Sequence, residues 1–63
     1  MKVRDVIRRL KEDGWQVVRQ TSSHRVFKKE NVENNVVVAG HPSDDVPTGT
    51  LSKIRRETGL PLR

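Results

Sequence analysis

Sixty-three residues, none of them cysteine, suffice for one small domain and exclude a disulfide framework and a thiolate metal site. Only 32% of the residues are hydrophobic, so we expect a thin core. Thirteen basic residues against eight acidic ones give a net charge of +5, which favours a polyanionic partner. Nucleic acid is the first such partner to consider. No apolar run is long enough to span a bilayer, and a charged amphipathic segment follows Met1 in place of a signal peptide, so we expect a cytoplasmic protein with no membrane contact.

The first expected element is a helix over residues 2–13. Apolar residues recur there at intervals of three and four, with charged residues between them. They are Val3, Val6, Ile7 and Leu10. This spacing gives one apolar stripe, and Gly14 is suited to end the helix in a left-handed turn.

Two strands are predicted next, over residues 15–21 and 24–29, where the pattern changes to a period of two. If Ser22 and Ser23 form a two-residue turn, antiparallel pairing sets Thr21 opposite His24 and Val18 opposite Phe27. On that register Val18 and Phe27 face the helices. His24 faces outwards, on the side shared by Val17, Arg19, Val26 and Lys28.

The second half of the chain predicts a hairpin loop over residues 30–35, a buried strand over 36–39 and a loop over 40–47. A helix over residues 48–58 follows, which Thr48 or Thr50 can cap.

Gly59 can end that helix, and Asp44 and Asp45 are expected near the positive end of its dipole. The tail at residues 60–62 is expected to pack back onto the sheet.

The order of elements is therefore α-β-β-β-α in one domain over residues 1–63. Connections this short oblige neighbouring strands to pair, so we predict an α+β fold with a three-stranded antiparallel sheet and both helices on one face.

His24 is the first candidate functional residue. Ser23 precedes it at the turn, and Arg25, Lys28 and Lys29 follow it along the strand. Such a group suits contact with a phosphodiester, because cations hold the backbone while an imidazole exchanges protons near neutral pH. An exposed hairpin in a basic protein can also carry a histidine without a function, and the residues alone leave both interpretations open.

His41 is the second candidate, either as a further proton-transfer or phosphate-contacting group or as a loop residue that braces the end of the strand. His41, Asp44 and Asp45 with His24 match no recognised metal spacing, so we expect no metal and no cofactor. The sequence also lacks the glycine patterns of hydrolase nucleophiles and of nucleotide-binding loops.

Several motifs together resemble the HicA family of toxins from toxin–antitoxin pairs. They are Asp13-Gly14-Trp15, Ser22-Ser23-His24 followed by Phe27, the valine strand into His41-Pro42, and Pro47-Thr48-Gly49-Thr50-Leu51 with Ile54 and Gly59. The family usually has a glycine before the Ser-His pair, where this chain has Ser22, and that difference affects the turn type more than the chemistry.

The resemblance implies a fold similar to a double-stranded-RNA-binding domain, an mRNA-cleaving endoribonuclease and a HicB-type antitoxin that forms a heteromeric complex with it. The resemblance implies that His24 corresponds to the family's catalytic histidine. Arg25, Lys28, Lys29, Ser23 and His41 are then the expected RNA contacts. RNA carries a 2′-hydroxyl beside each phosphate. A side chain that acts as a general base and removes its proton can therefore start the cleavage without a metal.

The alternative is a non-catalytic RNA-binding module of the double-stranded-RNA-binding type, which has the same order of elements. Such modules typically carry a Gly-Pro before the histidine and a lysine cluster at the start of the last helix. Here Lys53 stands alone at that point, so the match to recognition of duplex shape is poor.

Overall fold

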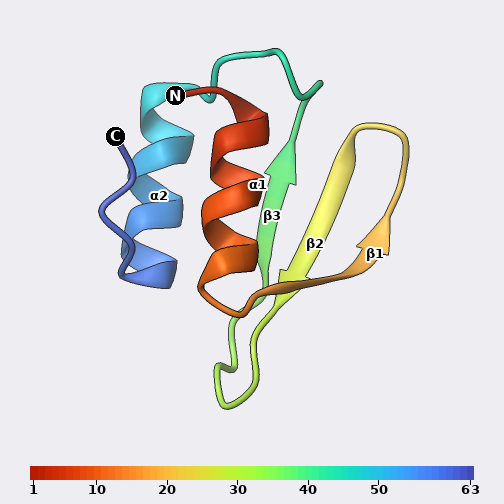
Figure 1. Cartoon of the computed structure of the whole chain (residues 1–63), viewed down its shortest axis with the longest axis vertical. Helices are drawn as coiled ribbons and strands as arrows, with labels where there is room; N and C mark the ends of the chain where they lie inside the picture. Colours follow the sequence, from red (N-terminus) through yellow and green to blue (C-terminus); the bar gives the residue numbers. More distant parts are fainter.

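The computed structural model describes residues 1–63 and has the predicted order of elements. They are α1 (Val3–Glu12), β1 (Gln16–Gln20), β2 (His24–Lys28), β3 (Val36–Ala39) and α2 (Thr48–Thr58). The strands form one antiparallel sheet in the order β1-β2-β3, and both helices lie on the same side of it (Figure 1). The predicted fold class is confirmed. No helix is long and apolar enough to cross a membrane.

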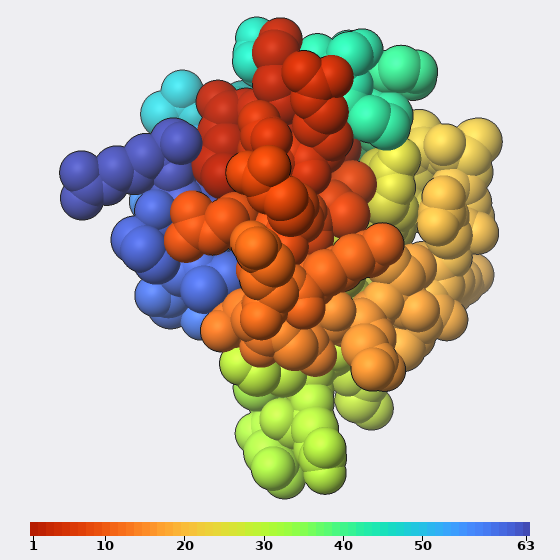
Figure 2. Space-filling view, in the orientation of Figure 1, coloured from red at the N-terminus to blue at the C-terminus, as the bar shows by residue number.

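The core lies between the helices and one face of the sheet. It contains eleven buried side chains, all of them apolar. They are Val3, Val6, Leu10, Trp15, Phe27, Val36, Val38, Val46, Leu51, Ile54 and Leu62. Phe27, Val36 and Val38 are the sheet's members, so the alternate residues of β2 and β3 face away from the helices. Figure 2 shows the helical side, where α1 covers the centre between α2 and the β1–β2 hairpin.

Gly14 ends α1 as predicted, with φ of +96°. The Trp15 N–H donates to the Leu10 carbonyl (2.9 Å) and the Gly14 N–H donates to the Lys11 carbonyl (3.1 Å), which is the hydrogen-bond pattern of a Schellman motif. The motif turns the chain sharply and directs Trp15 into the core at the entry to β1.

A β-bulge at Val18 changes the predicted register of the hairpin. Near the turn the pairing is as expected, because the Thr21 N–H donates to the His24 carbonyl (2.9 Å). Beyond Arg19, however, the register shifts so that Val17, not Val18, lies opposite Phe27. Val17 packs against the core and Val18 is 57% exposed, so the prediction that Val18 faces the helices is wrong. The extra residue of the bulge reverses the parity of the strand before it.

The loop after β3 caps the first turn of α1. The Val3 N–H donates to the Asp44 carbonyl (2.9 Å) and the Arg4 N–H donates to the Pro42 carbonyl (3.1 Å), so backbone carbonyls satisfy donors that a helix start leaves free. Lys2 forms an ion pair with Asp45 (Nζ to Oδ1, 3.3 Å). The two aspartates that we expected near α2 thus contact His41 and the segment before α1.

Helix α2 has the predicted bounds, but its start differs from the prediction. Its N-cap residue is Pro47, and no side chain caps it, so the prediction of a threonine cap is wrong. Gly59 ends the helix in the left-handed conformation, with φ of +73°.

The tail runs back beside α2, not over the sheet (Figure 1). Leu62 is fully buried, and its carbonyl accepts a hydrogen bond from Arg55 Nη1 (2.9 Å). The expectation that the tail packs onto the sheet is therefore wrong, although Leu62 belongs to the one hydrophobic core.

Candidate active site

His24 is the first residue of β2 and lies on the sheet face that the helices leave open. Residues 21–23 make the turn before it, closed by the hydrogen bond between the Thr21 N–H and the His24 carbonyl. On the other side His24 pairs with Ala39 of β3. The turn on one side and β3 on the other thus flank its backbone, while its side chain is exposed.

Ser23 contacts the ring of His24. Its Oγ lies 3.2 Å from His24 Nδ1. When Nδ1 carries the proton, the Nδ1–H donates a hydrogen bond to the serine oxygen and Nε2 keeps a free lone pair. The arrangement fits an exposed imidazole whose Nε2 is available as a base.

Two cations share the outer face with His24. Lys28 is exposed and lies four residues further along β2, roughly 13 Å away at the usual rise of a strand. Arg19 is exposed and pairs with Val26, which is only two residues from His24. Arg19 is the closer of the two to His24. The sequence predicted that it shares a face with His24, but it was not among the expected RNA contacts.

Arg25 and Lys29 lie on the opposite side of the sheet from His24, since strand side chains alternate. Arg25 is half-buried and its Nη1 donates to the Gly40 carbonyl (3.1 Å). Lys29 Nζ donates to Asp13 Oδ2 at 3.0 Å. The structure therefore brings neither of these two expected RNA contacts together with His24.

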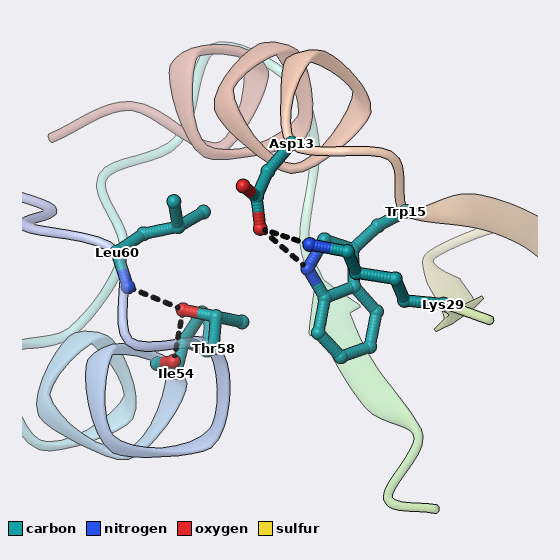
Figure 3. A network of polar contacts seen from close by, with 6 residues as sticks. All are labelled: Asp13, Trp15, Lys29, Ile54, Thr58 and Leu60. Carbon is teal, nitrogen blue, oxygen red and sulfur yellow. Dashed lines mark hydrogen bonds and ion pairs between the residues drawn. The ribbon is translucent and has the colours of Figure 1, made fainter. Parts of the chain in front are cut away.

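Asp13, at the end of α1, bonds to the residues that flank the β1–β2 hairpin, Trp15 before β1 and Lys29 after β2 (Figure 3). Its Oδ2 accepts from Lys29 Nζ and from Trp15 Nε1 (3.2 Å). The hydrogen bond from Lys29 lowers the pKa of Asp13 below its usual value, and the bond from Trp15 adds to the effect. This cluster positions the entry to β1 and explains Lys29 without an RNA contact.

His41 lies in the loop that meets the turn before His24. The Gly40 N–H donates to the Ser23 carbonyl at 2.8 Å, so the residue before His41 is hydrogen-bonded to the residue before His24. His41 is exposed, and its backbone N–H donates to Asp44 Oδ2 (3.0 Å). Its Nδ1 accepts from the Ser43 N–H (3.3 Å), with Ser43 Oγ at 2.8 Å, and its Nε2 has no hydrogen-bond partner in the protein. The two histidines therefore occupy the same end of the sheet.

The candidate site is an open surface. The molecule has no pocket, and no group of three or more His, Cys, Asp and Glu side chains is close enough together to hold a metal ion. Small-molecule ligands usually bind in enclosed clefts. An exposed imidazole beside surface cations is better suited to an extended anionic polymer.

A family model described as "HicA toxin of bacterial toxin-antitoxin" matches residues 3–60 of the chain. The matched region spans all five elements, including the turn before His24 and the loop that carries His41. No curated protein matches the chain.

Proposed function

The chain belongs to the HicA toxin family, and from this premise we propose that it is a metal-independent endoribonuclease that cleaves mRNA with His24 assisting proton transfer. The observation that carries the proposal is the exposed His24 ring on the open face, with Ser23 at Nδ1. Toxins of this family generally cleave mRNA. The basic surface supports RNA as the substrate, since a net charge of +5 favours a phosphate backbone.

In the proposed reaction His24 Nε2 takes the proton from a ribose 2′-hydroxyl. The 2′-oxygen then attacks the adjacent phosphorus, the bond from phosphorus to the 5′-oxygen breaks, and a 2′,3′-cyclic phosphate remains. The departing 5′-oxygen needs a proton. We assign this proton to Nε2 of His41 in its imidazolium form, because the Gly40–Ser23 hydrogen bond brings its loop to the same end of the sheet. In that form His41 Nδ1 donates to Ser43 Oγ and gives up the bond from the Ser43 N–H.

The remaining RNA contacts are assigned by face. Arg19 serves the phosphates nearest His24, and Lys28 serves a phosphate further along the strand, since about 13 Å separates it from His24. Ser23 positions the His24 ring. Arg25 acts through the Gly40 carbonyl, which it holds at 3.1 Å, and so positions the loop of His41.

Membership of a toxin–antitoxin family implies a cognate antitoxin. We propose that a HicB-type antitoxin covers the open face of the sheet. Val18 is 57% exposed there, Val37 is 48% exposed, and Val26 lies between them on the middle strand. Apolar surface flanked by Arg19 and Lys28 suits an acidic partner with apolar residues at its centre.

The test of the nuclease proposal is cleavage of a labelled single-stranded RNA by the purified toxin in the presence of a chelator. His24→Ala should lower the rate by about a hundredfold to ten-thousandfold, the usual range for a lost general acid or base. Ser22→Ala, in the same exposed turn, is the matched control and should cleave at the wild-type rate.

A substrate with a single 2′-deoxy residue at the cleavage site should remain intact if the 2′-oxygen is the nucleophile. Unchanged cleavage by His24→Ala would overturn the assignment of His24. A wild-type protein that shifts the RNA in a gel without cutting it would instead support the non-catalytic binding module.

A further inference from the structure

The outer edge of β3 is an unpaired strand edge. β3 ends the sheet on one side, because the strand order is β1-β2-β3. Its pairing with β2 alternates, and the bond from the Gly40 N–H to the Ser23 carbonyl fixes the phase: Val36 and Val38 exchange hydrogen bonds with β2. The N–H and C=O groups of Val37 and Ala39 therefore point away from the sheet, and no backbone or side-chain group of the protein bonds to them.

β3 also lacks the features that protect an edge strand. Such strands usually carry a charged residue, a proline or a bulge that discourages pairing with another chain. The opposite edge, β1, has the bulge at Val18 and the charge of Arg19. The four residues Val36–Ala39 have neither, and Val37 and Ala39 are exposed on the outer face. Of the two edges of the sheet, β3 is therefore the one that can pair with a further strand.

We propose that a β-strand of the cognate antitoxin adds to the β3 edge and extends the sheet to four strands. This inference rests on the proposed toxin–antitoxin function. The added strand would bond through its backbone to Val37 and Ala39, and its side chains on the outer face would extend the apolar row that Val37 begins.

A second copy of this chain fits the edge less well. Two copies would each bring a net charge of +5. Four residues in each strand also bury much less than the roughly 1,200 Å² of a stable interface. An acidic antitoxin removes both difficulties, because the rest of its surface can continue from the added strand across the open face to Lys28 and Arg19.

Hydrogen exchange measured for each amide tests the proposal on the wild-type complex. In the free toxin the amides of Val37 and Ala39 should exchange fast and those of Val36 and Val38 slowly, since only the latter pair bonds to β2. On binding the co-expressed antitoxin, Val37 and Ala39 should slow by at least about a hundredfold. Fast exchange of both amides in the complex would overturn the proposal.

A matched pair of substitutions tests the same edge through affinity. Val37→Pro removes an N–H that makes no bond within the toxin, and edge strands accept proline. Val37→Thr keeps the N–H and the branched shape. Antitoxin binding, measured by calorimetry, should weaken about tenfold or more for Val37→Pro relative to Val37→Thr, as expected for one lost hydrogen bond with a steric block.

Equal affinity of the two Val37 variants, with equal unfolding midpoints, would contradict strand addition. The amide measurement needs no variant, so misfolding of Val37→Pro leaves the proposal testable. RNA cleavage by the wild-type toxin is a separate measurement. A toxin that does not cleave RNA would contradict the nuclease proposal, whereas unprotected amides in the complex would contradict strand addition at β3.

Discussion

The bulge at Val18 predicts opposite outcomes for two adjacent, chemically identical residues. Val17 packs against the core opposite Phe27, whereas Val18 is 57% exposed. Replacing either by alanine removes two methyl groups, worth about 1.6 kcal/mol when fully buried. For the half-buried Val17 the expected loss of unfolding free energy is about 1 kcal/mol, and for Val18 it is at most about 0.5 kcal/mol.

The two variants, Val17→Ala and Val18→Ala, are compared by urea unfolding and by thermal melting. Their loss of strand propensity is the same, so it cancels in the comparison. In a protein of this size a difference of 1 kcal/mol shifts the midpoint of melting by roughly 4–8 °C. Aspartate at the same positions enlarges the contrast, because a carboxylate that faces the core loses its water. A larger loss at Val18 than at Val17 would refute the bulge and restore the regular hairpin register.

Four further predictions concern other parts of the molecule. Arg19→Ala and Lys28→Ala should each weaken RNA binding and lower the slope of log affinity against log salt by about 1, measured by fluorescence anisotropy. Lys29→Met should lower the melting midpoint but leave the cleavage rate unchanged, because its ammonium is held by Asp13. Since the folded-state pKa of Asp13 is lowered, its contribution to stability should be present above pH 4 and be lost as the pH falls through that lowered pKa; Asp13→Asn should flatten this part of the stability profile measured by urea unfolding. Leu62→Ala should cost about 2–4 kcal/mol, visible as a lower urea midpoint, because the leucine is fully buried although it is next to the last residue.

The sequence predicts those features that a local pattern encodes. The apolar spacing in α1 and the glycines after both helices gave element bounds within a residue or two, because periodicity and left-handed turns have direct sequence signals. The bulge has no such signal. Val17 and Val18 are identical, so only the packing of the whole hairpin decides which of them faces inwards.

Long-range backbone contacts were also beyond sequence-based prediction. The carbonyls of Pro42 and Asp44 cap α1, and any residue type can supply a carbonyl. For the same reason the sequence predicted only part of the arrangement of side chains around His24. His24 and Lys28 share a face because strands alternate, but the partners of Arg25 and Lys29 lie fifteen and sixteen residues away in the chain. A long cationic side chain can choose among such partners only once the fold has formed.

Because the site lies outside the core, the role of His24 in cleavage can be tested without a change in the stability of the fold. Its side chain is exposed, lies outside the core and has the hydroxyl of Ser23 as its hydrogen-bond partner. Substitution at such a position usually changes stability by no more than about 0.5 kcal/mol. Its backbone hydrogen bond with Thr21 in the turn does not depend on the side chain. A large loss of cleavage in His24→Ala, with the melting midpoint preserved, would therefore report chemistry at the imidazole and not a loss of structure.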